Sequence, residues 1–151
     1  MITIGLRCSP SEVTFAIYDS DSSALVNVEQ IVVPIAYDWP EKLKHIRSNL
    51  LDILREYGVM RAGVRLAEPM AKAVNIDRTH IEGVVQEAFA SSDLQGYYVG
   101  AIATIAARIG VDRNLVKEMV AGKNTLEIEN WDTLTANERE AVLTAVGASR
   151  V

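Results

Sequence analysis

Three stretches rich in β-forming residues occupy the first quarter of the chain, and their close spacing limits the possible folds more than any other feature. They cover residues 2–8, 13–18 and 25–33. Two short polar segments separate them, Ser9 to Glu12 and Asp19 to Ser23. Connections this short and this rich in turn-forming residues join neighbouring antiparallel strands. We therefore predict an antiparallel meander of three strands.

A strong helical pattern follows the meander. Asp38 is suited to cap the helix and Pro40 to its first turn, and Gly58 is suited to its end. Between these positions apolar side chains recur every three or four residues, which is typical of a helix with one buried face. These residues are Leu43, Ile46, Leu50, Ile53, Leu54 and Tyr57.

The remainder of the chain alternates between predicted strands and helices. A meander followed by such alternation implies an α/β fold with a mixed five-stranded sheet and helices on its faces. A length of 151 residues fits a single domain, residues 1–151. We predict strands over 62–67 and 97–103, and helices over 78–91, over 104–120 with a break at 110–112, and over 137–148.

Composition excludes several classes of protein. No apolar run approaches the roughly 18 residues of a membrane helix, and no signal peptide is evident. We therefore expect a cytoplasmic protein with no membrane partner. The single cysteine, Cys8, excludes an internal disulfide and a cysteine-cluster zinc site. The formal charge of −5 lacks the basic surplus usual in proteins that grip duplex nucleic acid.

Four short segments resemble, in order, the motifs of the RuvC-type Holliday-junction resolvases, a branch of the RNase H-like superfamily. Gly5-Leu6-Arg7-Cys8-Ser9 resembles the end of the family's first strand, and Val64 to Glu68 resembles the end of its fourth. The segments 111–120 and 137–145 resemble the last two motifs. The resemblance covers nearly the whole chain in element order and implies the RNase H-like fold.

The resemblance also implies a site, with departures from the family pattern. Such nucleases hold two divalent metals, Mg²⁺ or Mn²⁺, between clustered carboxylates. Glu68 and Glu140 provide carboxylates at two of the four places, and Asn137 stands at a third. Arg7 replaces the aspartate of the first strand, which puts a fixed cation where metal charge belongs. We therefore expect no two-metal catalysis and no cofactor.

We hypothesise that Arg7 points at Glu68 and Glu140 and neutralises them, so that a former active site has become a structural ion pair. Each residue also has a simpler interpretation. Arg7 would then flank its strand and reach water. Glu68 would be a solvated acid at a strand end, and Glu140 would lie on the polar face of a helix.

Two functions from different classes follow from these observations. The favoured one is a catalytically degenerate RuvC-like domain that acts as a binding or assembly module, with a second copy of the chain, another protein or nucleic acid as partner. The alternative is a nuclease, dependent on Mg²⁺ or Mn²⁺, that acts on structured nucleic acid and uses Glu68, Glu140 and a non-standard third ligand.

Overall fold

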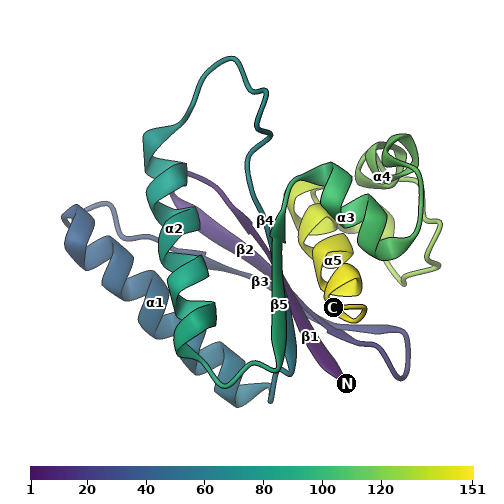
Figure 1. Ribbon diagram of the computed structural model, residues 1–151, viewed down its shortest axis with the longest axis horizontal. Helices are drawn as coiled ribbons and strands as arrows, with labels where there is room; N and C mark the ends of the chain where they lie inside the picture. The colour runs from purple at the N-terminus through teal and green to yellow at the C-terminus, as the bar shows by residue number, and fades with distance from the viewer.

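The structure is a computed structural model that describes residues 1–151, and a mixed five-stranded sheet forms its centre (Figure 1). The strand order is β3-β2-β1-β4-β5. β2 runs antiparallel to both β1 and β3, whereas β1, β4 and β5 are parallel. The predicted meander and mixed sheet are confirmed. The strands are β1 Ile2–Cys8, β2 Glu12–Asp19, β3 Ala24–Val32, β4 Arg61–Arg65 and β5 Gly96–Gly100.

Helices cover both faces of the sheet. Figure 1 shows α1 and α2 on one face, and α5 with α3 and α4 on the other. No helix combines the length and the apolar character needed to cross a membrane. The helices are α1 Trp39–Glu56, α2 Ile76–Ser91, α3 Ile102–Ile109, α4 Arg113–Val120 and α5 Ala136–Ala148, with a 3₁₀ turn at Trp131–Thr133.

Local capping explains where the helices begin and end. The Asp38 side chain accepts the Glu41 N–H and starts α1 as predicted. The predicted break between α3 and α4 is confirmed, because Gly110 has a φ of +83° that ends α3. The predicted strand over 97–103 is too long by three residues, because Ala101 is already the N-cap of α3. Similarly, α2 begins at Ile76, two residues before the predicted start at residue 78, because Asn75 caps it.

α5 lies directly on the sheet and is buried from Glu140 to Ala148. Its backbone comes so close to β1 that a Cβ at Gly5 would lie 2.1 Å from the Ala141 carbonyl oxygen. Two hydrogen bonds hold α5 on the sheet: Thr3 Oγ1 of β1 donates to the Ala145 carbonyl at 2.8 Å, and Tyr98 Oη of β5 donates to the Thr144 carbonyl at 2.8 Å. This packing places the first half of α5 over the end of β1.

Candidate functional site

The predicted site residues gather at the edge of the sheet where the parallel strands β1 and β4 end. Arg7 and Arg65 are paired neighbours near the ends of these strands. Glu68 follows β4 after three residues, and Glu140 reaches the same place from α5. Open α/β sheets commonly place their binding sites at the carboxyl ends of parallel strands.

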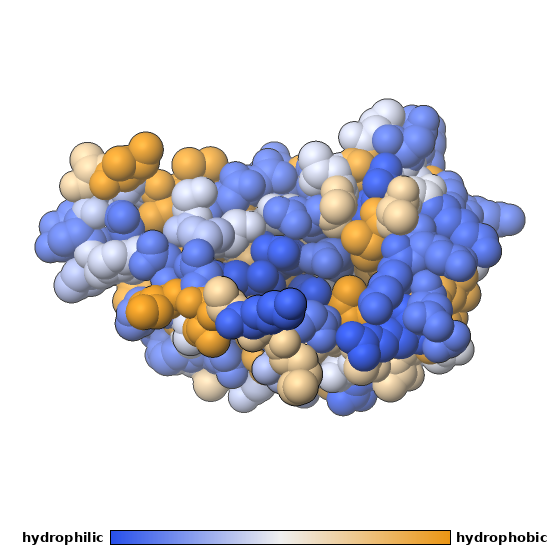
Figure 2. Space-filling view, turned by 90° about the horizontal axis from the view of Figure 1, so that it is seen from above, coloured by the Kyte–Doolittle hydropathy of each residue, from blue (hydrophilic) through white to orange (hydrophobic).

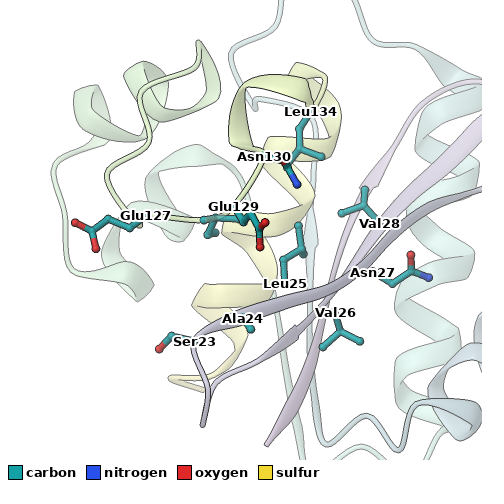
Figure 3. Close-up of a pocket in the computed structure, with 11 residues that line it drawn as sticks. Ser23, Ala24, Leu25, Val26, Asn27, Val28, Glu127, Glu129, Asn130 and Leu134 are labelled. Carbon is teal, nitrogen blue, oxygen red and sulfur yellow. The ribbon is translucent and has the colours of Figure 1, made fainter.

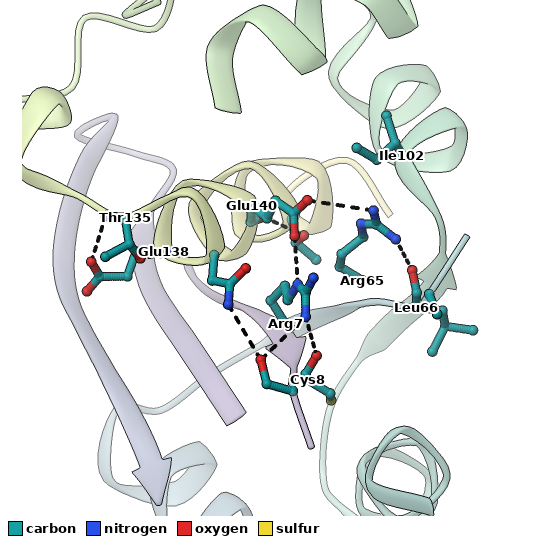
Figure 4. A network of polar contacts seen from close by, with 12 residues as sticks. Arg7, Cys8, Arg65, Leu66, Ile102, Thr135, Glu138 and Glu140 are labelled. Atoms are coloured by element: carbon teal, nitrogen blue, oxygen red, sulfur yellow. Dashed lines mark hydrogen bonds and ion pairs between the residues drawn. The ribbon is translucent and has the colours of Figure 1, made fainter. Parts of the chain in front are cut away.

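Arg7 forms a close ion pair with Glu140. Arg7 Nε donates to Glu140 Oε2 at 2.8 Å, and only 17% of the arginine side chain and 11% of the glutamate side chain are exposed (Figure 4). Arg7 Nη1 also donates to the Cys8 carbonyl at 2.6 Å. A charge-assisted contact of this length, shielded from water, is among the stronger polar interactions in a protein. Arg7 therefore points into the cluster rather than out to solvent.

A second arginine, Arg65, links the two predicted acids. Its Nη2 lies 3.3 Å from Glu68 Oε1 and 3.6 Å from Glu140 Oε1, and its Nη1 donates to the Leu66 carbonyl. Burial lowers the pKa of the Arg65 guanidinium, and the charges of Glu140 and Glu68 oppose that shift. The Nε–H of Arg65 is buried and has no partner. Arg65 is therefore a largely desolvated cation that depends on the two carboxylates.

Glu68 lies at the exposed side of the cluster and has three partners. Besides Arg65, its Oε1 accepts the Ile102 N–H at the first turn of α3 at 3.2 Å. The positive end of a helix dipole favours a carboxylate at this position. Its Oε2 lies 3.6 Å from Arg113 Nη2, where 51% of the arginine side chain is exposed. Both oxygens of Glu68 are thus engaged by this chain's own cationic and N–H groups.

The structure differs from the hypothesis about Arg7 in one respect. Arg7 pairs with Glu140 alone, and Arg65 makes the contact to Glu68 that was assigned to Arg7. Asn137 stays outside the ion pairs, because its Nδ2 donates to Ser9 Oγ at 3.5 Å. We call Arg7, Arg65, Arg113, Glu68 and Glu140 the arginine–glutamate cluster.

Sequence reasoning overlooked Arg65, and the signal that marks it is a single charged residue in the otherwise apolar stretch 62–67. It also overlooked Glu82, which is buried on α2. Glu82 Oε2 accepts the Ala67 N–H at 2.8 Å and the Arg78 Nε–H at 3.2 Å. Glu82 therefore fixes the position of Ala67, in the short segment that joins β4 to Glu68. The polar pattern of α2 does not identify it, since Glu82 looks like an ordinary surface residue there.

The donor set at this edge does not fit a pair of divalent metals. Two hard cations need several carboxylate oxygens between them. Here Glu68 and Glu140 are the two carboxylates of the cluster, and three guanidinium groups lie against them. No group of three or more His, Cys, Asp or Glu side chains is placed to share a metal ion. The most exposed group of the cluster is the guanidinium of Arg113, which lies beside Glu68.

Exposed apolar residues lie in and beside the two loops that leave the same edge of the sheet. β3 runs in the same direction as β1, so the loop after β3 and the loop after β4 start from one edge. Figure 2 views this end and shows a mostly hydrophilic centre with apolar groups toward the side that α1 occupies in Figure 1. Exposed apolar groups that gather in this way are typical of contact surfaces. The residues are Val32, Ile35, Met70, Val74 and Ile76.

No protein-family model matches the chain, and no curated protein matches it either. Among solved structures it resembles RuvC from Thermus thermophilus, with a TM-score of 0.74 at 13% sequence identity. It also resembles Thermus thermophilus RuvC in complex with a Holliday junction substrate, with a TM-score of 0.73 at 12% identity. Both alignments cover 99% of this chain and 93% of the other. The predicted fold is confirmed: this chain has the RuvC type of RNase H-like fold.

Proposed function

We propose that this protein is a RuvC-like domain that binds nucleic acid or a protein partner without two-metal cleavage. The observation that carries the proposal is the arginine–glutamate cluster at the carboxyl edge of the sheet. Arg7 and Arg65 neutralise Glu68 and Glu140 at the place where the family resemblance puts metal ligands. A metal pair there needs both carboxylates, and each is already held by a guanidinium.

The fold supports nucleic acid as the first class of partner to test. One solved structure with this fold is a RuvC bound to a Holliday junction substrate. Arg113, half exposed beside Glu68, supplies a cation suited to phosphate at the same edge. The exposed apolar residues of the two flanking loops add surface for a protein partner, including a second copy of the chain.

A cleavage and binding assay separates this proposal from the nuclease alternative. Labelled four-way junction, single-stranded and duplex DNA are incubated with the protein in Mn²⁺, in Mg²⁺ and in EDTA. We expect no cleavage in any of them, and we expect any binding to be equal with and without metal. Binding of nucleic acid is expected to weaken steeply with salt.

Glu68→Ala is the informative variant in this assay. Metal-dependent cleavage by the unmodified protein that is lost in Glu68→Ala would establish the nuclease alternative and refute the proposal. Cleavage that Glu68→Ala retains would point to a contaminating enzyme instead. Circular dichroism on the same samples checks that the variant is folded.

A further inference from the structure

A groove lies along the outer side of β3 and shares no residue with the arginine–glutamate cluster. Its volume is about 440 Å³, and its walls are β3 and the segment from Glu127 to Leu134. Figure 3 shows Leu25 and Val28 rising from β3 toward the segment that carries Glu129 and Asn130. Ile128 and Leu134 add apolar surface. The groove is therefore apolar at its base and runs beside six consecutive residues, 23–28.

The strand that forms one wall is an open sheet edge. β3 is the first strand in the sheet order and pairs only with β2. None of the backbone hydrogen bonds outside the regular elements involves residues 24–32. The outward N–H and C=O groups along the groove are thus free to pair with another extended chain. The five residues of β3 that line the groove, 24–28, span about 17 Å, which matches a partner segment of about five residues.

The charges around this groove are all of one sign. The segments 8–41 and 124–138 contain six and four acidic residues and no Lys or Arg. Glu127 and Glu129 are exposed on the groove wall and take part in none of the ion pairs. Arg139, which follows the second segment, donates to backbone carbonyls, including those of Val120 and Trp131. No cation of this chain therefore lines the groove.

The net charge of −5 thus hides an uneven distribution of charge along the chain. The two acidic segments hold ten of the twenty acids, and the other ten are outnumbered by fifteen Lys and Arg residues. The negative charge of Glu127 and Glu129 beside the groove repels nucleic acid. It also repels a second copy of itself, and the bulge at Val26 is a further feature that discourages edges from pairing with one another. A positively charged, extended partner can pair with the free backbone groups of β3 and also attract the acidic side chains beside them.

We propose that this groove binds an extended, positively charged segment of a partner protein, which adds to β3 as a further strand. The backbone of β3 supplies the hydrogen bonds, the apolar base takes alternate side chains, and Glu127 and Glu129 select Lys or Arg. This site is independent of the arginine–glutamate cluster, so it stands even if the cluster proves to be a nuclease centre.

The probe is an acetylated, amidated six-residue peptide of alternating Lys and Val, and fluorescence anisotropy of a labelled copy measures its affinity. Two matched peptides serve as controls: one with Glu in place of Lys, and one with alternate amides N-methylated so that one edge cannot pair. We expect the Lys–Val peptide to bind, the Glu–Val peptide not to bind, and the N-methylated peptide to bind at least tenfold more weakly. Hydrogen exchange is expected to slow at residues 24–28 on binding.

Two double variants with the same change of net charge test the location. Glu127→Lys with Glu129→Lys is expected to weaken binding at least tenfold, because like charges then oppose each other. Glu56→Lys with Asp93→Lys alters exposed acids on other parts of the molecule and is expected to change affinity less than twofold.

Several outcomes overturn the proposal. It fails if the unmodified protein does not bind the Lys–Val peptide at millimolar concentration, or if both double variants lose affinity equally. If the N-methylated peptide binds as tightly as the Lys–Val peptide, charge attraction alone explains the binding, and strand addition is also refuted. Amides 24–28 that are protected in the free protein and become exposed on dilution would show that a second copy occupies the edge instead.

Discussion

Replacement of Arg7 by Ala is the most direct test of the arginine–glutamate cluster. Removal of one partner of a buried ion pair costs about 3–5 kcal/mol, because the other charge is left buried. Glu140 is 11% exposed, so it is largely desolvated, but it retains Arg65 at 3.6 Å. We therefore expect Arg7→Ala to lower the free energy of unfolding by about 2–3 kcal/mol. For a chain of this length that corresponds to a fall in Tm of about 4–12 °C.

Urea unfolding at pH 7, followed by circular dichroism, measures this change. Arg47→Ala is the matched control, because Arg47 forms an ion pair with Glu87 in which both side chains are about half exposed. Removal of such a surface pair is expected to cost about 0–1 kcal/mol. A loss for Arg7→Ala no larger than for Arg47→Ala would refute the reasoning. A clear rise in the Tm of the unmodified protein on addition of Mg²⁺ would refute it as well.

Three further measurements test the packing around the site. Gly5→Ala is expected to cost more than about 3 kcal/mol in urea unfolding, because the new Cβ would lie 2.1 Å from the Ala141 oxygen; a fully stable variant would contradict the position of α5. Tyr98→Phe removes the bond to Thr144 and is expected to cost about 1–2 kcal/mol by the same assay, against no change if that bond is absent. Burial raises the pKa of the Cys8 thiol to about 12, so we expect no reaction with Ellman's reagent at pH 8 until the protein unfolds. Because the thiol of the unfolded chain ionises first, stability is expected to fall as pH rises above about 9, by up to about 1.4 kcal/mol per pH unit, and Cys8→Ala removes that slope.

The order of elements could be predicted from the sequence because local signals determine it. Polar turns separate the apolar strands of the meander, and the capping side chain of Asp38 and the positive φ of Gly110 mark helix ends. Element boundaries were less accurate than element order. The end of β5 is one example, since Ala101 caps α3 without a side-chain hydrogen bond and nothing in its type marks it as a cap.

The sequence also identified three of the cluster's members, because Arg7, Glu68 and Glu140 stand at motif positions. It did not show which arginine meets which acid. That pairing depends on how α5 lies across β1, which is set by contacts between residues more than 130 positions apart in the chain, such as that of Gly5 with Ala141. Arg65 and Glu82 became part of the site for the same reason, since only packing removes their side chains from water.

The sequence by itself therefore determined a meander, the alternation that follows it and a cation in place of an expected acid, because these are properties of neighbouring residues. The tertiary structure alone decided how charge is distributed in space. It brought the guanidinium groups of Arg7, Arg65 and Arg113 around two carboxylates at one edge of the sheet. It also brought the acidic residues Glu127 and Glu129 beside the open strand β3. Electrostatic interactions depend on distance through space, and separation along the chain does not predict that distance.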